Sequence, residues 1–322
     1  MSYMLKKVFY SYPKPLWFFQ KTHWYHSTHS SSGYDKLKPY GFPIHGCICW
    51  YSRRIPWLEV VKSNNDPSVP AKLYLDTVQS LKGCPRIVRS DCGTKNVTLA
   101  AIQCSLRATD QDEYAAEKAH RYGSSPENQW IEGWWSFLKH SNSSWWISFF
   151  KDMSESGLLN LGDTFHLECL WFFFAKVIQA DLDKVIDHWN SHHIRHSRHN
   201  TVSGVPDVFF FLPEHSGASD CLIPVTQAQV DEMDQYCELP QHTEEYAEYF
   251  EYVIANKNYP TNVKEAFDFF QYFIHLRQPW SNAWHNELEM SESTFVICQN
   301  DFHKPKKKMW GTHCPPWFCC IP

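Results

Sequence analysis

The sequence predicts an α/β fold in which a mixed sheet is flanked by helices. Apolar segments of strand length come first in the chain, and a capped helix, a short strand and a long amphipathic helix follow them. Strands that give way to helices in this manner are typical of an α/β domain. With 322 residues, the chain is long enough for one large domain with attachments or for two domains.

Three strands are predicted from short apolar segments. Residues 42–49 (FPIHGCIC) and 55–61 read as two strands joined by a turn at 51–54. Gly83 and Pro85 end the preceding helical segment, and a third strand, at 85–91, places an acid, Asp91, at its carboxyl end.

The helices are predicted from caps and from periodicity. The sequence NNDP at 64–67 begins a helix over about 69–81, and a Ser-Pro pair at 125–126 begins another that runs to about 139. Apolar residues recur with a period of 3.6 over 165–189, which predicts a long amphipathic helix. An acidic segment at 227–276 is also expected to be helical.

Composition excludes several classes of protein. Apolar residues make up 43% and charged residues 20% of the chain, which excludes a disordered, collagen-like or coiled-coil protein. No apolar run approaches the roughly 20 residues of a membrane span, and the first 20 residues do not read as a signal peptide. The 12 cysteines are scattered, so we interpret them as reduced thiols of an intracellular protein, nuclear or cytoplasmic. The basic run KPKKK at 304–308 is compatible with nuclear import.

Charge is divided unevenly along the chain. Residues 1–214 hold 23 Lys and Arg against 20 Asp and Glu, whereas residues 215–322 hold 7 against 15. Neutralised phosphates supply most of the non-specific affinity for nucleic acid. If DNA binds, it is therefore expected on the first two-thirds of the chain.

Two acids on different elements form the candidate catalytic pair. Asp91 ends the strand at 85–91, and Glu132 lies in the second turn of the helix that begins at 125. A hard cation such as Mg²⁺ takes oxygen ligands from separate elements. Two such ions, about 4 Å apart, can clamp the attacking and leaving oxygens of a phosphodiester. Taken alone, the two residues also fit ordinary surface acids.

A series of segments between residues 33 and 195 carries a family resemblance. They are GYDKLKPYGF (33–42), IHG (44–46), YSRRIPWLEV (51–60), SNNDP (63–67), RIVRSDCGTKN (86–96), IEGWWSFL (131–138), WWI with FFKD (145–152) and HWN with IR (188–195). In this order they resemble the integrase core of animal transposon-derived proteins. The resemblance covers about 29–214 and continues weakly to about 276. It implies an RNase H-like fold, dependence on Mg²⁺ and DNA strand transfer by an Asp, Asp, Glu triad.

The resemblance assigns roles to three positions. Asp91 matches the second acid and Glu132 the third, so both are the implied catalytic residues and ligands of Mg²⁺ or Mn²⁺. The first acid normally stands just before the Gly-Tyr-Asp-Lys-Leu segment, where this chain has Ser32. A hydroxyl does not bridge two metal ions as a carboxylate does, so any metal binding is expected to be weak.

Asp35 is the nearest acid to the lost position. Side chains alternate along a strand, so residues 32, 34 and 36 share one face and Asp35 points away. Three residues also displace it by about 10 Å. It would need a bulge or a shifted register to serve as the ligand. The chain departs from the family at two further places: Cys49-Trp50 replaces the usual Asp-Gly, and Cys92 stands where Arg is common.

The sequence therefore predicts a transposon-derived integrase core protein, related to DNA integration and nucleic-acid binding, with impaired Mg²⁺-dependent strand transfer. The sequence does not decide whether the chain has polynucleotidyl transferase activity, because the triad is incomplete. The alternative is a non-catalytic DNA-binding or protein-interaction platform. A further alternative is a decaying gene product with no selected role.

We expect four regions: an irregular segment at 1–28, the integrase core at 29–214, an acidic helical extension at 215–280 and a loose tail at 281–322. DNA is the expected partner, and no membrane association is expected. The sequence does not decide whether the chain forms a homo-oligomer. Lys139 lies seven residues after Glu132, near the same helix face, and is a candidate DNA contact. The alternative for Lys139 is a solvated surface lysine.

Overall fold

The computed structural model describes residues 28–123, 129–196, 203–237, 246–254 and 258–277. The predicted N-terminal segment, except its last residue, and the predicted tail with the basic run at 304–308 lie outside the described residues. So does the Ser-Pro helix start at 125–126. In the described residues, no helix has the length and apolar character that a membrane span requires.

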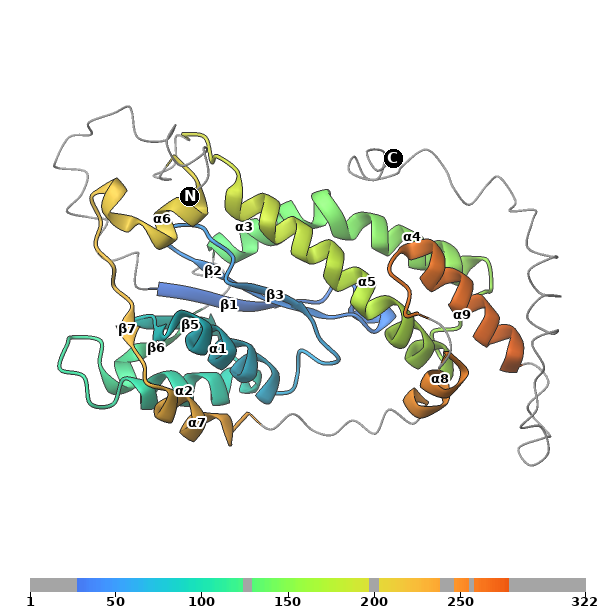
Figure 1. Ribbon diagram of the computed structural model, residues 1–322, viewed down its shortest axis with the longest axis horizontal. Helices are drawn as coiled ribbons and strands as arrows, with labels where there is room; N and C mark the ends of the chain where they lie inside the picture. The colour runs from blue at the N-terminus through green and yellow to red at the C-terminus, as the bar shows by residue number, and fades with distance from the viewer. Residues whose placement is uncertain (1–27, 124–128, 197–202, 238–245, 255–257, 278–322) are drawn as a thin grey trace.

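A five-stranded mixed sheet forms the centre of the fold (Figure 1). Its order is β3-β2-β1-β5-β6, and β1 is antiparallel to β2 but parallel to β5. The strands are β1 (Thr28–Tyr34), β2 (Ile44–Cys49), β3 (Trp57–Val60), β5 (Ile87–Asp91) and β6 (His120–Gly123). A separate two-stranded sheet pairs β4 (Gly83–Cys84) with β7 (Ile223–Pro224).

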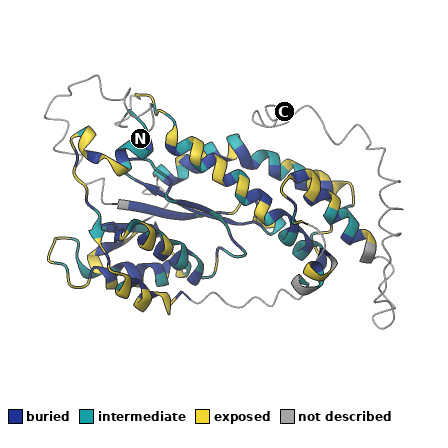
Figure 2. Cartoon of the chain, viewed as in Figure 1, coloured by how far each residue is buried: buried dark blue, intermediate teal, exposed yellow. Residues whose placement is uncertain are grey.

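The sheet is covered on both faces, which explains why the sequence of strand β2 is apolar. All six of its residues are buried. Ile44 and Ile48 belong to one hydrophobic core, whereas Cys47 belongs to a second core with Trp57. Because side chains alternate across a strand, a strand covered on both faces is apolar at nearly every position. Figure 2 shows the buried residues concentrated between the sheet and its helices.

Two layers of helices supply these cores (Figure 1). One layer holds α1 (Ser68–Leu81), α2 (Val97–Leu106) and α7 (Gln227–Asp234). The other holds α3 (Gln129–Leu138), α4 (Ser144–Glu155) and α5 (Thr164–Ser191), with a π-helical turn, Lys139–Ser143, between α3 and α4. A short helix, α6 (Pro206–Phe211), follows α5. A mixed sheet with helices on both faces confirms the predicted RNase H-like class.

The C-terminal helices extend the core beside α5. The acidic segment forms α7, α8 (Ala247–Ile254) and α9 (Val263–Arg277) instead of one continuous helix. Phe250 of α8 and Phe273 of α9 both contact Phe173 of α5, with ring centroids 5.9 and 5.0 Å away. The extension thus covers an aromatic surface of α5 that the sheet does not cover.

Helix α5 also satisfies backbone groups at the edge of the sheet. Gln179 accepts a hydrogen bond from Val60 N–H at 2.9 Å and donates one to the Leu58 carbonyl at 3.1 Å. Asn190 does the same for the N–H and carbonyl of Ile55, at 2.9 and 3.0 Å. Each amide takes the place of a neighbouring strand, so edge strand β3 and the turn before it are fixed against α5.

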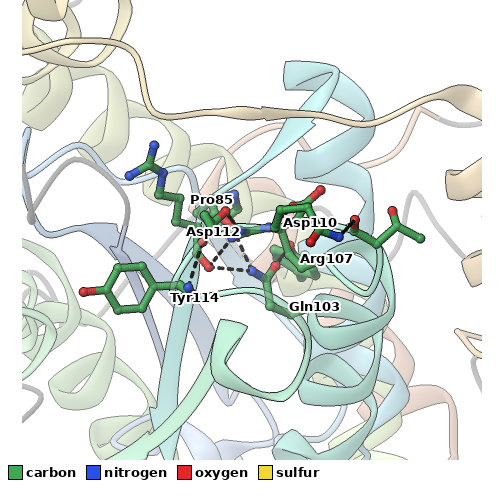
Figure 3. Close-up of polar contacts among 10 residues, drawn as sticks. Pro85, Gln103, Arg107, Asp110, Asp112 and Tyr114 are labelled. Atoms are coloured by element: carbon green, nitrogen blue, oxygen red, sulfur yellow. Dashed lines mark hydrogen bonds and ion pairs between the residues drawn. The ribbon is translucent and has the colours of Figure 1, made fainter.

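A buried arginine fixes the segment between α2 and β6 (Figure 3). Arg107 is fully buried and forms ion pairs with Asp110 and Asp112. Its third contact is a hydrogen bond, 2.7 Å long, to the carbonyl of Arg86, the residue before β5. This cluster therefore ties the 107–112 segment to the start of the strand that ends at Asp91.

Candidate active site

The strand register places Ser32 beside Asp91. In the parallel pair of β1 and β5, Ser31 lies opposite Ser90, so the next residues, Ser32 and Asp91, adjoin. The Ser32 hydroxyl donates a hydrogen bond to Asp91 Oδ2 at 3.1 Å. Ser32 is 3% exposed and Asp91 is half-buried. The structure thus brings together the first-acid and second-acid positions that the sequence predicts.

The segment after Asp91 folds back on the strand end. Asn96, which is buried, donates a hydrogen bond from Nδ2 to the Asp91 carbonyl at 3.1 Å. Residues 94–96 form a single 3-10 turn, and α2 begins at Val97. The DCGTKN sequence therefore turns the chain sharply and leaves Cys92 exposed at the strand end.

Ser32 faces helix α3. On β2 its directly opposed partner is Gly46, and opposed residues project to the same face of a sheet. A Cβ atom on Gly46 would lie 2.6 Å from Cη2 of Trp135, which belongs to α3. The glycine is thus required by the close approach of α3, and the Ser32–Asp91 pair lies on the sheet face that α3 covers.

Helix α3 carries Glu132 along strand β1. At the start of the helix, Trp130 lies against Arg53, 3.2 Å from Arg Cζ to the ring centroid. Trp135, further along, lies on Tyr34 at the end of β1, with ring centroids 5.3 Å apart. Half-buried Glu132 lies between these two contacts, one turn before Trp135 and on the same side of the helix. The third-acid position therefore lies on α3, the helix that covers the sheet face of the Ser32–Asp91 pair.

Asp35 lies apart from this site. It follows the end of β1, is exposed, and accepts a hydrogen bond from Asn64 Nδ2 at 2.9 Å. Its other oxygen is 3.6 Å from Lys38 Nζ. Neither contact involves Ser32, Asp91 or Glu132, and β1 contains no shift that would turn Asp35 toward them.

The donor atoms of the site are two carboxylates and one hydroxyl. Among the described residues, no group of three or more His, Cys, Asp and Glu side chains could hold a metal ion. Asp91 and Glu132 offer two carboxylates, whereas Ser32 offers a hydroxyl whose proton is directed at Asp91 Oδ2. Carboxylates are oxygen ligands of the kind that a hard cation takes. With a hydroxyl at position 32, the set lacks the third carboxylate that a two-ion site would use.

Lys139 lies outside this contact network. It is exposed and begins the π-helical turn after α3. Seven residues of helix place it about 10 Å beyond Glu132 along the helix axis.

Two arginines near the acids were not identified from the sequence. Arg89 stands two residues before Asp91 on β5, and its guanidinium lies over the ring of Trp50 at 5.3 Å. Arg53 lies over Trp130, two residues before Glu132. The period-two spacing of Arg89 and Asp91 is the one sequence signal that could have placed a positive charge on this face.

Comparison with models of known protein families found a match for this chain. A family model described as an integrase core domain matches residues 22–208. This match covers more than half of the chain and contains Ser32, Asp91 and Glu132. No curated protein matches the chain. On this match, the chain belongs to the integrase core domain family.

Proposed function

We propose that this chain is an integrase core protein of mobile-element origin that binds DNA and has impaired metal-dependent strand transfer. Membership of the integrase core family relates it to DNA integration and nucleic acid. The observation that supports impaired catalysis is the 3.1 Å hydrogen bond from Ser32 to Asp91 Oδ2, where the family has a first carboxylate.

The chemistry of the site follows from its donor atoms. Integrase core domains generally use Mg²⁺ or Mn²⁺, which stabilises charge on the phosphodiester and its attacking oxygen. Asp91 and Glu132 would hold one such ion weakly. The Ser32 hydroxyl adds no charge, and it occupies an oxygen lone pair of Asp91 that a metal ion would otherwise use. Without a carboxylate at position 32, the chain's own residues would hold a second ion poorly, so strand transfer is expected to be absent or very slow.

The test is strand cleavage and joining on a DNA oligonucleotide with Mg²⁺ or Mn²⁺. Three proteins are compared: the chain itself, Ser32→Asp, and Ser32→Asp combined with Glu132→Gln. We expect activity from Ser32→Asp alone. Activity in the unsubstituted chain that Glu132→Gln abolishes would show that the chain is an active integrase. If all three proteins fold and bind DNA but none cleaves or joins it, the assignment of Ser32, Asp91 and Glu132 to the site is wrong.

The second candidate function is a non-catalytic platform that binds DNA or another protein, with the core retained for binding or for self-association. The same hydrogen bond favours it, because the fold stays intact while the first ligand is missing. Salt-dependent DNA binding without metal-dependent cleavage in either the chain or Ser32→Asp would favour the platform over a lapsed enzyme.

A further inference from the structure

Two histidines lie one turn apart at the C-terminal end of α5. His188 is exposed and His192 is half-buried. The His192 N–H donates to the His188 carbonyl at 3.0 Å and closes the last turn of the helix. Residues four apart on a helix are neighbours on one face. The two imidazole rings are accordingly stacked, with centroids 6.1 Å apart and planes 16° from parallel.

The ring of His192 is held in the orientation and the tautomer of a metal ligand. Its Nδ1 lies 2.5 Å from the Trp189 carbonyl. A carbonyl only accepts, so in the neutral ring Nδ1 carries the proton and Nε2 keeps its lone pair. The ring also packs on Trp189, with ring centroids 4.8 Å apart. Histidines that bind metals almost always donate their other ring N–H to a carbonyl, a carboxylate or water.

The surroundings of the pair favour a cation. The carbonyls at the end of a helix carry partial negative charge, which stabilises positive charge in the last turn. Lys184, one turn before His188, forms an ion pair with Asp181 at 3.3 Å. A metal–nitrogen bond is about 2.0–2.1 Å long, so the rings are close to the separation at which one ion contacts both. The exposed ring of His188 can turn toward such an ion.

We propose that Nε2 of His192 and a ring nitrogen of His188 bind one divalent transition-metal ion of the Ni²⁺, Cu²⁺ and Zn²⁺ class, with water as the remaining ligands. Imidazole suits these ions, whereas Mg²⁺ and Mn²⁺ prefer oxygen. The site therefore differs in chemistry from Asp91 and Glu132 and does not rest on the proposed function. The described residues contain no group of three or more His, Cys, Asp and Glu that could hold a metal, so the ion should exchange readily.

The ion would stabilise the turn that precedes β3. Trp189 and Asn190 lie between the two histidines in the sequence, and the Asn190 amide pairs with the N–H and carbonyl of Ile55. An ion that joins His188 to His192 restrains unwinding of the last helical turn and so preserves these bonds. An ion that binds only the folded helix also stabilises the folded protein. Slower hydrogen exchange at Ile55 is thus a readout of this site.

The experiment is a calorimetric titration of the untagged full chain with Ni²⁺ in excess Mg²⁺, which competes for oxygen sites. Ni²⁺ is the probe because it suits imidazole, whereas thiolates select Zn²⁺ and Cu⁺. The variants are His188→Gln, His192→Gln and the control His193→Gln, which removes an exposed histidine beside the pair. Each of the first two should weaken the tightest Ni²⁺ site by about 10-fold or more, since even loss of an outer-shell partner has an effect of this size. His193→Gln should match the full chain.

Hydrogen exchange then locates the ion. Ni²⁺ should slow exchange at Ile55 in the full chain and in His193→Gln, but not in the other two variants. Thermal melting without metal reports folding, and His188→Gln alone decides if the half-buried His192 proves necessary for the fold. The proposal is wrong if a folded His188→Gln or His192→Gln binds Ni²⁺ as the full chain does, or if His193→Gln loses as much affinity. Neither result bears on DNA binding or strand transfer, so the proposed function is tested separately.

Discussion

The Ser32 hydroxyl and the Asp91 carboxylate occupy one rung of the sheet, 3.1 Å apart, on neighbouring parallel strands. A carboxylate at position 32 would therefore adjoin Asp91 directly. The same rung continues to Gly46, over which Trp135 of α3 lies. The chemistry of the site and the distance between α3 and the sheet are thus linked through one row of residues.

Gly46→Ala is expected to destabilise the fold. The added methyl group would lie 2.6 Å from Trp135 and 3.1 Å from Leu58, both buried in the core. Overpacking of this kind costs about 1–3 kcal/mol and would push α3 away from the sheet. Urea unfolding measures the loss.

The matched control for Gly46→Ala is Gly133→Ala. Gly133 is an exposed residue of α3, and an added Cβ atom there would meet nothing within 4 Å. Alanine in a helix interior is favoured over glycine, so this variant should gain about 0.5–1 kcal/mol. Equal effects from the two substitutions would contradict the packing of α3 on Gly46.

Two buried histidines should make the protein acid-sensitive. Burial, with a smaller effect of Lys95, lowers the pKa of His45 to about 3, and burial lowers the pKa of His120 to about 4. In the unfolded chain both have a pKa near 6.5. Below that pH the unfolded state binds more protons than the folded state. Stability should therefore fall as pH drops from about 6.5 toward 4, by up to about 1.4 kcal/mol per pH unit for each histidine.

Unfolding free energies between pH 7 and pH 4.5 test this acid sensitivity. His45→Gln and His120→Gln should each show a flatter pH dependence than the full chain. A slope that is the same in all three proteins would contradict the buried neutral state of His45 and His120.

Arg107→Met should be strongly destabilising. It leaves Asp110, Asp112 and the Arg86 carbonyl without the guanidinium that each contacts. Removing one partner of a buried ion pair costs about 3–5 kcal/mol, and about 2–4 kcal/mol is expected here because the aspartates are partly exposed. Denaturant unfolding checks the value. Lys184→Met, which breaks an exposed pair with Asp181, should change stability by about 0.5 kcal/mol or less, and a similar loss in both would refute the argument.

The side-chain amide of Asn190 should contribute more to the free energy of unfolding than the amide of an exposed glutamine. Asn190→Leu removes both hydrogen bonds to Ile55 and leaves its buried N–H and carbonyl unpaired, for a cost of about 2–4 kcal/mol. Gln227→Leu, at an exposed position, serves as the control. Hydrogen exchange at Ile55 should accelerate in Asn190→Leu alone. Unchanged exchange at Ile55 in that variant would show that the amide does not fix the turn.

The fold could be predicted where apolar periodicity is strong. The helices predicted at 69–81 and 165–189 correspond to α1 (Ser68–Leu81) and α5 (Thr164–Ser191), with ends that differ by one or two residues. Strand β6 was not predicted, because this four-residue polar strand, His120–Gly123, is defined by its pairing with β5 and not by its own sequence pattern. Helix α2 was not predicted either. The acidic segment was predicted only as helical, since its division follows from packing on different partners: α7 lies against α1, whereas α8 and α9 lie against α5.

The site was predictable only in part. Local sequence places Asp91 at a strand end and Glu132 on a helix, but their relation to Ser32 requires the pairing of β1 with β5, which the family resemblance supplied. The contacts of Arg89 with Trp50 and of Arg53 with Trp130 join residues far apart in the sequence. They depend on how the turn after β2 folds, so no local signal shows them.

Binding of Mn²⁺, followed by calorimetry and by the electron paramagnetic resonance of the free ion, tests the central claim most directly. The account predicts at most one weakly bound ion for the chain, tighter binding or a second ion for Ser32→Asp, and loss of that gain when Glu132→Gln is added. Two tightly bound ions in the unsubstituted chain would contradict it, and so would Mn²⁺ binding that Ser32→Asp leaves unchanged.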